Sequence, residues 1–401
     1  MMKVTTPRST PRSTAQKKTP LISMLTPHKG IYKMFSILLL LVGQSGIAQG
    51  EKADAKTRHD RLEEMIIDES LEAYNERMKW FAEAKFGMFI HFGLYSQLGG
   101  EWKGEEVQYL YAEWIQNKAD IPKEEYAELL KTFNPTKFDA EFIVTTAKEA
   151  GMKYLVITAK HHEGFCLWDS EYTEYDVAST PFKGRDILDE LNKACQKHGL
   201  KFGLYYSILD WHHPAQKRKR HYSLIKKGRK QEYLDYQKNQ VLELIEKYDP
   251  ALLWFDGDWC EWWSKDEKAG IDLYNAIRKA SPKVIANNRI GARFWFELDY
   301  ITVEQGKFDD AQPHHWESCY TIGESWGYKK GDKPKTSPGR YFRKLNEINS
   351  NGGNYLLNIG PDGDGEVPAW SVDFIRAMGK MYEAKPPTKN IPEIEAVPGI
   401  R

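Results

Sequence analysis

Residues 153–162 read KYLVITAKHH, a run of apolar and β-prone residues followed at once by His161 and His162. The run lacks the alternation of a half-exposed strand, so it predicts a strand covered on both faces, as in a parallel sheet. Polar side chains that directly follow such a strand lie at its carboxyl end, where parallel α/β folds build their active sites. This stretch therefore predicts both an element of the fold and the place of its chemistry.

Seven further runs have the same character and are also predicted as strands. They lie at residues 85–93, 200–207, 251–256, 283–289, 299–304, 316–320 and 354–360. Helical patterns separate several of them, at residues 139–150, 187–198, 233–248, 273–280 and, as the last helix, 341–349. Eight strands alternating with helices predict one (β/α)8 barrel of the TIM type. A doubly wound sheet is the alternative, but no G-x-G-x-x-G motif follows the first strand to support it.

The charge balance excludes several classes of protein. The chain has 401 residues, and 57 Lys and Arg offset 57 Asp and Glu, which argues against a nucleic-acid partner. Zero net charge also gives no electrostatic reason to bind an anionic membrane. The four cysteines show no C-x-x-C spacing, so we expect buried free thiols rather than a zinc site or a disulfide scaffold.

The amino terminus resembles a targeting segment. The short apolar run at residues 34–42 follows a basic stretch and precedes the small residues Gly46 and Ala48. This pattern predicts a signal peptide cleaved near residue 49, with Met1 or Met34 as the start, and a buried helix as the alternative. We therefore expect an exported protein with a leader at 1–49, a catalytic domain at 50–384 and a Pro-rich tail at 385–401. We expect no stable membrane insertion after cleavage, and we interpret the basic segment 212–231 as a solvated loop.

Polar residues collect at the predicted strand ends. They are His91, His161, His162, Tyr205, Tyr206, Asp256, Arg289, Glu304 and Glu317. Asp256 and Glu304 end two different strands, and two carboxylates facing each other across a pocket can perform retaining glycoside hydrolysis. For Asp256 a metal-ligand, helix-capping or ion-pairing role stays open. The loop tryptophans Trp102, Trp211, Trp316 and Trp326 are candidates for sugar platforms or for packing.

The histidines allow a second interpretation. Imidazoles bind either sugar hydroxyls or a metal ion. His91, His161 and His162 with Asp256 would form the site of a metal-dependent hydrolase, although H-x-H and H-E-x-x-H spacings are absent. Arg289 offers a fixed fork for a carboxylate or for hydroxyl oxygens, or an ion pair below the site.

Several motifs together resemble the α-L-fucosidases of glycoside hydrolase family 29. The similarity covers roughly residues 75–380 in the order of the family. The motifs that carry it are KFGMFIHFG at 85–93 followed by Glu101-Trp102, FNPTKFD at 133–139, KHHEGF at 160–165, LYYS at 204–207, LWFDG at 253–257, WESC at 316–319, SWGY at 325–328 and NYLLNIGP at 354–361.

The resemblance implies a barrel-shaped enzyme that removes fucose from fucosylated oligosaccharides or glycoconjugates in two displacements, without a metal or other cofactor. It implies that Asp256 is the nucleophile. Glu304 stands where many members place the acid/base, and Glu317 is its rival. The resemblance further implies fucose contacts at His91, Glu101, Trp102, His161, His162, Tyr205, Trp254 and Arg289, and a methyl contact at Trp326.

One departure from the family concerns the carboxyl terminus. Many members carry a C-terminal β-sandwich, whereas about 20 residues follow the last matched helix here, near residue 380, too few for such a domain. A catalytically inactive barrel that only binds glycans is the non-enzyme alternative. The oligomeric state and the fucosyl linkage are not predicted.

Overall fold

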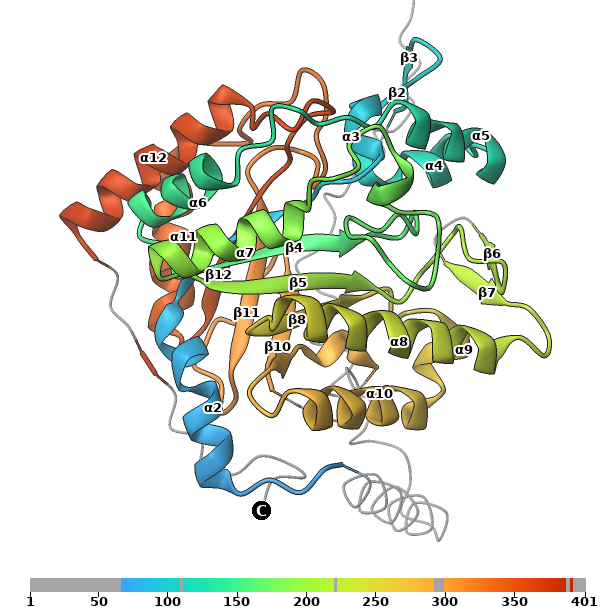
Figure 1. Ribbon diagram of the computed structural model, residues 1–401. Coiled ribbons are helices and arrows are strands. Elements are labelled where there is room, and N and C mark those ends of the chain that lie inside the picture. The colour runs from blue at the N-terminus through green and yellow to red at the C-terminus, as the bar shows by residue number, and fades with distance from the viewer. Residues whose placement is uncertain (1–65, 109–110, 220–221, 292–298, 387–389, 392–401) are drawn as a thin grey trace, which may run out of the picture. The chain divides into compact units, whose positions relative to one another are not determined.

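The computed structural model describes residues 66–108, 111–219, 222–291, 299–386 and 390–391. The predicted signal segment and most of the tail lie outside these residues. Eight parallel strands form the centre of the described fold (Figure 1). They are β1 (Phe86–Ile90), β4 (Tyr154–Lys160), β5 (Lys201–Ser207), β8 (Leu252–Asp256), β9 (Ile285–Ala286), β10 (Ile301–Glu304), β11 (Trp316–Thr321) and β12 (Asn354–Ile359).

The eight strands close into a barrel. Their order in the sheet is β10-β11-β12-β1-β4-β5-β8-β9, so each strand lies beside its neighbours in the sequence. Asn287, just after β9, forms a parallel bridge with Tyr300, just before β10, and the N–H of Asn288 donates to the carbonyl of Tyr300 at 2.9 Å. This bridge joins the two edge strands, and the (β/α)8 barrel is confirmed.

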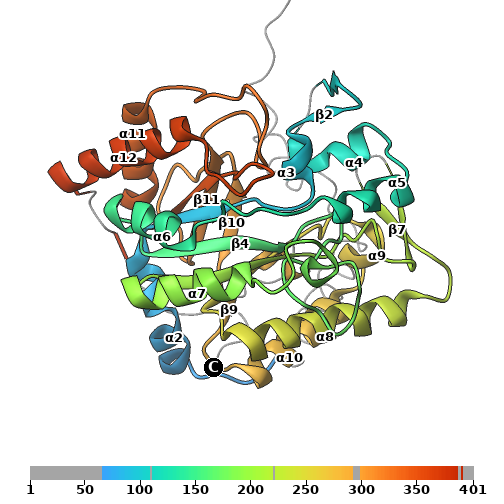
Figure 2. The same ribbon diagram turned by 45° about the horizontal axis from the view of Figure 1, so that its top comes forward.

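Helices cover the outside of the barrel. The five predicted helices are present as α6 (Ala140–Glu149), α7 (Ile187–His198), α8 (Lys230–Tyr248), α10 (Glu267–Ala280) and α11 (Pro338–Ser350), and α2 (Leu71–Ala84) precedes β1. The prediction that residues 341–349 form the last helix is wrong, because α12 (Ala369–Ala384) follows. Figure 2 shows α12 beside α11 and α6, and its Gly379 lies so close to Ala150 that an added Cβ would stand 2.7 Å from the Ala150 Cα.

The basic segment after β5 is more ordered than predicted. It contains an antiparallel hairpin of β6 (Gln216–Arg218) and β7 (Ser223–Ile225). Gln216 and Ser223 are buried, and the Oγ of Ser223 donates to the Oε1 of Gln216. The lysines and Arg218 hid this pattern, because their charges dominate the composition of the segment.

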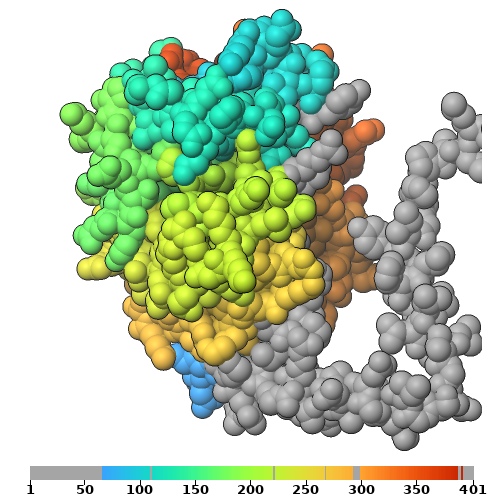
Figure 3. Space-filling view, turned by 90° about the vertical axis from the view of Figure 1, so that its right-hand side faces the viewer, coloured from blue at the N-terminus to red at the C-terminus, as the bar shows by residue number. Residues whose placement is uncertain are grey.

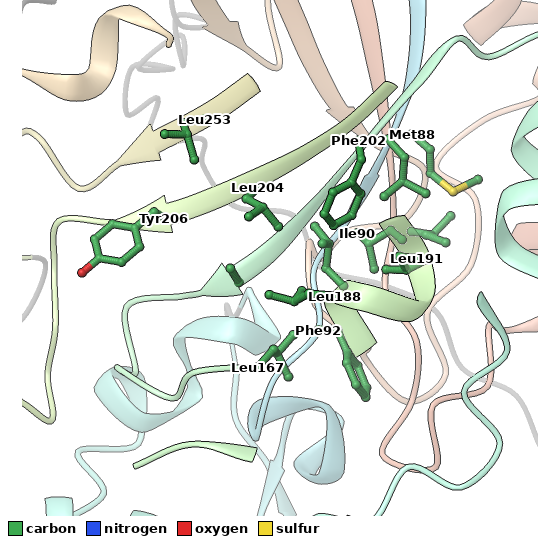
Figure 4. Close-up of a cluster of buried hydrophobic side chains, with 14 of the residues drawn as sticks. Met88, Ile90, Phe92, Leu167, Leu188, Leu191, Phe202, Leu204, Tyr206 and Leu253 are labelled. Atoms are coloured by element: carbon green, nitrogen blue, oxygen red, sulfur yellow. The ribbon is translucent and has the colours of Figure 1, made fainter. Parts of the chain in front are cut away.

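Two apolar layers explain why the strand runs are almost continuously hydrophobic. One layer lies between the strands and the outer helices, where Met88, Ile90 and Leu204 face Leu188 and Leu191 of α7 (Figure 4). The other layer fills the barrel interior and contains Phe89, Tyr154, Val156, Tyr205, Leu252, Trp254, Ile285, Tyr300, Cys319 and Leu356. Alternate residues of a strand therefore face two dry environments, as expected for a covered parallel sheet.

Gly87 makes room for the interior layer. A Cβ at this position would stand 2.5 Å from the ring of Tyr154, which is fully buried in the barrel. The motif around Gly87 therefore has a steric reason, because any side chain there would displace an aromatic ring from a close-packed interior.

The amino-terminal end of the barrel is held by a buried acid, Asp299. Its side chain is fully buried and pairs with Arg77 of α2 at 2.8 Å. It also accepts hydrogen bonds from the hydroxyl of Tyr274 on α10 at 2.8 Å and from the N–H of Ala286 in β9 at 2.7 Å. One carboxylate thus joins two helices to the strands where the barrel closes.

Removal of this carboxylate is expected to destabilise the fold strongly. Asp299→Ala leaves the buried charge of Arg77 with one acidic partner fewer, a change that costs about 3–5 kcal/mol when a buried pair is broken. Urea unfolding followed by circular dichroism measures the loss. Asp272→Ala is the matched control, because Asp272 forms an exposed i,i+4 pair with Lys268 and its removal should cost less than about 0.5 kcal/mol. Equal losses in the two variants would contradict the role given to Asp299.

Candidate active site

The strand ends surround a cavity of about 760 Å³. Figure 3 views the molecule from the side toward which β4 and β5 point in Figure 1. The residues that line the cavity are Phe89, His91, Glu106, Gln108, Tyr111, Glu113, Trp114, Lys118, His161, His162, Tyr205, Trp254, Asp256, Trp259, Arg289, Glu304, Cys319, Glu324, Trp326 and Lys329. Nine residues predicted from the sequence are among them: His91, His161, His162, Tyr205, Trp254, Asp256, Arg289, Glu304 and Trp326.

Asp256 lies at the carboxyl end of β8 with partners on both oxygens. Nη1 of Arg289 donates to Oδ1 at 2.6 Å, and the hydroxyl of Tyr205 donates to Oδ2 at 3.1 Å. Nε2 of His162 stands 3.7 Å from Oδ2. The side chain is 13 % exposed, so these partners hold the carboxylate at the cavity surface in one orientation.

Arg289 connects Asp256 to the second carboxylate. Its Nη2 donates to Oε2 of Glu304 at 3.2 Å, and its Nε donates to Oγ1 of Thr302 at 2.9 Å. Burial opposes the guanidinium charge, but the carboxylates of Asp256 and Glu304 outweigh it and raise the pKa of Arg289 above its usual value. The side chain of Glu304 is 41 % exposed, so one guanidinium holds a deep acid and a shallow acid in the same cavity.

Glu317, the rival of Glu304, lies one layer deeper. The register of β10 and β11 pairs Glu304 with Cys319, which lines the cavity, and pairs Glu317 with Thr302. Glu317 is fully buried and accepts hydrogen bonds from the hydroxyl of Tyr154 at 2.5 Å and from Nε1 of Trp254 at 2.8 Å. It does not line the cavity and instead anchors the tryptophan of its floor.

The three histidines lie in the cavity as neutral side chains. Burial lowers the pKa of His91 to about 3 and that of His162 to about 4, and it lowers the pKa of His161 well below its usual value. Adjacent imidazoles add to the effect, because the rings of His161 and His162 are 4.1 Å apart. At neutral pH each ring therefore offers one N–H donor and one acceptor.

The hydrogen bonds of His91 and His162 leave an acceptor toward the cavity. Nδ2 of Asn358 donates to the carbonyl of Trp326 at 2.6 Å, so Oδ1 of Asn358 accepts from Nδ1 of His91 at 2.7 Å. Ser207 likewise donates to the carbonyl of Leu209, and its Oγ accepts from Nδ1 of His162 at 2.6 Å. Nε2 of both rings is then an acceptor, which suits the hydroxyl groups of a sugar.

Aromatic rings form the floor and one wall. Trp254 stacks on Tyr205 with ring centroids 5.5 Å apart, and Arg289 lies over the same indole at 4.8 Å. Trp326 packs beside His91 at 5.1 Å. Flat apolar faces with polar edges are the surfaces that bind the C–H faces of sugars.

Three of the four predicted loop tryptophans, Trp102, Trp211 and Trp316, do not line the cavity. Trp316 begins β11, is 1 % exposed and donates from Nε1 to the carbonyl of Asn351 at 3.1 Å, so the prediction that it stands in a loop after a strand is wrong. Trp211 is buried behind the wall, where it packs against Trp114 and His162.

A Glu-Trp pair occupies the cavity, but it is Glu113-Trp114 rather than Glu101-Trp102. Glu101 and Trp102 form β2 (Glu101–Trp102), and Glu101 pairs with Lys330 at 3.0 Å outside the cavity lining. Glu113 is 1 % exposed, and its Oε2 accepts from the N–H of Gly327 at 2.8 Å. Burial raises the pKa of Glu113 to about 7. Within the described part of the chain its Oε1 has no hydrogen-bond partner.

The comparisons with known proteins decide the family. The family model described as alpha-L-fucosidase matches residues 54–385. The chain belongs to the α-L-fucosidase family, glycoside hydrolase family 29.

Relatives within this family align with most of this chain. Human plasma alpha-L-fucosidase is 34 % identical over 352 residues, which span 82 % of this chain and 71 % of the relative. A fucosidase from Lactobacillus casei in complex with its α-L-fucose product is 36 % identical with a TM-score of 0.69 over 77 % of this chain and 99 % of the other. A Bacteroides thetaiotaomicron fucosidase, trapped as a covalent intermediate with 2-fluoro-fucosyl fluoride, is 35 % identical with a TM-score of 0.71 over 77 % and 75 %.

Sequence reasoning missed Glu113, Trp114 and Trp259, which line the cavity. The signal for the first two was present, because Glu-Trp occurs at both 101–102 and 113–114, and the motif was assigned to the first copy. The two copies differ in where the chain places them relative to the barrel. Residues 112–114 form a short 3-10 turn that contacts the helical turn after β1. The four cysteines are buried and free, as predicted.

The burial of Glu317 makes the stability of the fold depend on pH. Burial raises the pKa of Glu317 from 4.5 to about 7, so the folded state keeps a proton that the unfolded chain loses above pH 4.5. Its contribution to stability is therefore present below pH 4.5 and is lost as the pH rises to about 7.

Glu317→Gln removes this titration while it keeps the shape and the acceptor for Trp254. The free energy of unfolding of the variant minus that of the wild type should rise by on the order of 1–3 kcal/mol from pH 4.5 to pH 7. Chemical denaturation at several pH values measures the difference. A constant offset between the two proteins across this range would show that Glu317 does not hold the proton.

Proposed function

We propose that the protein is a retaining exo-α-L-fucosidase in which Asp256 is the nucleophile and Glu304 is the acid/base. The observation that carries the proposal is the shared guanidinium of Arg289, which contacts both carboxylates at 2.6 and 3.2 Å. One carboxylate is ordered by three neighbours at the floor, and the other lies nearer the solvent, where a leaving group departs. This difference in position matches the different tasks of a nucleophile and an acid/base.

In the first displacement an oxygen of Asp256 attacks the anomeric carbon of fucose. The bond to the glycosidic oxygen breaks, and Glu304 gives that oxygen its proton. Arg289 and Tyr205 keep the attacking carboxylate fixed in direction until the covalent bond forms. The trapped covalent intermediate of the Bacteroides relative supports this route.

In the second displacement water attacks the same carbon. Glu304, now a carboxylate, accepts the proton of the water, and the bond between fucose and Asp256 breaks. The exposure of Glu304 gives the water a path to the side of the sugar that the leaving group has vacated. Two inversions at one carbon release fucose with its original configuration.

The other cavity residues bind the sugar in this proposal. His91, His161 and His162 contact its hydroxyl groups, Trp254 contacts its C–H face, and Trp326 contacts its methyl group. Glu113 and Trp114 take the roles that the resemblance gave to Glu101 and Trp102, because Glu113 has a free acceptor and Trp114 lies 5.0 Å from the ring of His162.

The two rival functions have weaker support. Among residues 66–386 as described, no group of three or more His, Cys, Asp or Glu side chains is arranged to hold a metal ion. The hydrogen bonds of His91 and His162 to Asn358 and Ser207 suit hydroxyl binding. A barrel that only binds glycans has no need for two carboxylates on one guanidinium.

We also propose that the protein is exported, with fucosylated glycans as its substrates and residues 50–384 as the catalytic domain. The plasma and tissue fucosidases among its relatives support export. In the described part of the chain, no helix has the length and apolar character needed to span a membrane.

Replacement of the nucleophile tests the proposal directly. Asp256→Gly should lower kcat for an aryl α-L-fucoside by about 10³-fold or more, because no covalent intermediate forms. Sodium azide should restore part of the activity, since the anion fits the vacancy beside Arg289, and should give β-fucosyl azide. Steady-state rates and product analysis by NMR measure both effects. Wild-type turnover by Asp256→Gly would rule out this nucleophile.

The acid/base assignment is tested by leaving-group dependence. Glu304→Ala should lower kcat/KM for a fucosyl disaccharide by about 10²–10⁴-fold and for dinitrophenyl α-L-fucoside far less, because only the poor leaving group needs a proton. Azide should then yield α-fucosyl azide. Glu317→Gln is the matched control and should affect both substrates to the same extent. The opposite pattern, with leaving-group dependence in Glu317→Gln, would transfer the role to Glu317.

A further inference from the structure

Trp259 is an exposed aromatic side chain inside the cavity. It lines the cavity and is 37 % exposed, whereas Trp254 and Trp326 are 2 % and 6 % exposed. Its indole is parallel to that of Trp114, with ring centroids 6.3 Å apart and planes 22° apart. A large apolar face that remains open to solvent in a pocket is characteristic of a binding surface.

Trp259 lies beside the place over Asp256 where fucose is proposed to bind, and not at that place. His162 contacts both sites, because its Nε2 is 3.7 Å from Asp256 and its ring is 5.6 Å from that of Trp259. Trp259 and Asp256 therefore lie beside the same imidazole, and Trp259, at 37 % against 9 %, is the more exposed of the two. The cavity of about 760 Å³ also exceeds what one pyranose fills, so space remains next to the glycosidic oxygen.

Local backbone geometry fixes this side chain. Gly257 has φ +86°, a conformation that favours glycine, and it turns the chain sharply after Asp256. Cys260, the next residue after Trp259, is fully buried and accepts at Sγ from the N–H of Ser223 in β7 at 3.2 Å. The loop that carries Trp259 is thus anchored at both ends and does not need a ligand to order it.

The β6–β7 hairpin braces both tryptophan-bearing segments. It holds the Trp259 loop through Ser223, and it holds α4 (Ile115–Lys118), which follows Trp114, because Nδ2 of Asn117 donates to the carbonyl of Lys219 at 2.7 Å. In Figure 3 the yellow-green surface of this region lies between the teal surface that contains α4 and the yellow to gold surface of the chain after β8. The basic insertion therefore has a role in the site that its composition did not reveal.

We propose that Trp259 is the platform of a second subsite, which binds the first sugar of the leaving group through a C–H face. The proposal rests on the proposed function, because it assumes that fucose occupies the position over Asp256. The ligand class is a hexopyranose of a fucosylated glycan. Its ring stacks on the indole while its glycosidic oxygen faces Glu304.

The test compares substrates with and without a sugar as leaving group. Trp259→Ala should lower kcat/KM for α-L-fucosyl-(1→3)-N-acetylglucosamine or α-L-fucosyl-(1→2)-galactose at least about tenfold more than for α-L-fucosyl fluoride, which has no ring to stack. Trp259→Phe should recover part of the loss. Tyr172→Ala is the control, because Tyr172 is 42 % exposed and lies outside the cavity lining. Equal effects on disaccharide and fluoride, or no effect on either, would overturn the proposal.

A binding measurement separates this proposal from the proposed function. In the Asp256→Asn background, calorimetric titration with the same disaccharides should show at least about tenfold weaker binding when Trp259→Ala is added. If the wild type fails to hydrolyse fucosyl fluoride, the proposed function fails while calorimetry still decides the platform. Unchanged affinity after loss of the indole would refute the platform whatever the outcome of the kinetic assay.

Discussion

A single buried positive charge organises the site. Arg289 is 4 % exposed and stands at the end of β9, where removal of its guanidinium from water is costly unless acidic partners compensate. Asp256 and Glu304 supply that compensation, and neither can be removed without leaving the guanidinium under-paired. The requirement for pairing thus draws two carboxylates from different strands into one cavity. Electrostatic pairing and the geometry that the proposed mechanism needs are satisfied by the same three side chains.

The position of Arg289 depends in turn on the closure of the barrel. β9 has two residues, and the chain then turns through Asn287 and Asn288 to meet Tyr300. The side chain of Asn288 accepts from the N–H of Thr302 at 3.1 Å, and Thr302 accepts from Nε of Arg289. The contact that joins the last pair of strands therefore also aims the guanidinium. Below it, Asp299 ties the same strands to α2 and α10, so polar contacts on two levels hold the short strand β9 where the barrel closes.

Most of the barrel could be predicted from the sequence because its strands are covered on both faces and their apolar runs are long. Depth within the barrel could not be predicted in the same way. Glu317 and Cys319 share the inward face of β11, but two residues of rise along the strand separate an anchor of the floor from a wall of the cavity. The sequence also did not show whether Glu101-Trp102 or Glu113-Trp114 lines the cavity, because these two identical dipeptides differ only in the loop path that follows β1. Helix α12 was missed because no strand follows it to complete another βα unit.

The loop after β8 connects Asp256 to Trp259. Asp256 ends the strand, Gly257 reverses the chain, and Trp259 stands two residues later on the outer wall. Asp256 and Trp259 both contact His162. Because burial lowers the pKa of His162 to about 4, its ring is neutral at pH 7 and adds no charge between them. A shift of this loop would therefore move Asp256, the proposed nucleophile, and the proposed leaving-group platform together. In that arrangement the glycosidic bond would stay between the proposed fucose position over Asp256 and the proposed platform at Trp259. The tight turn at Gly257 sets the separation of these two surfaces.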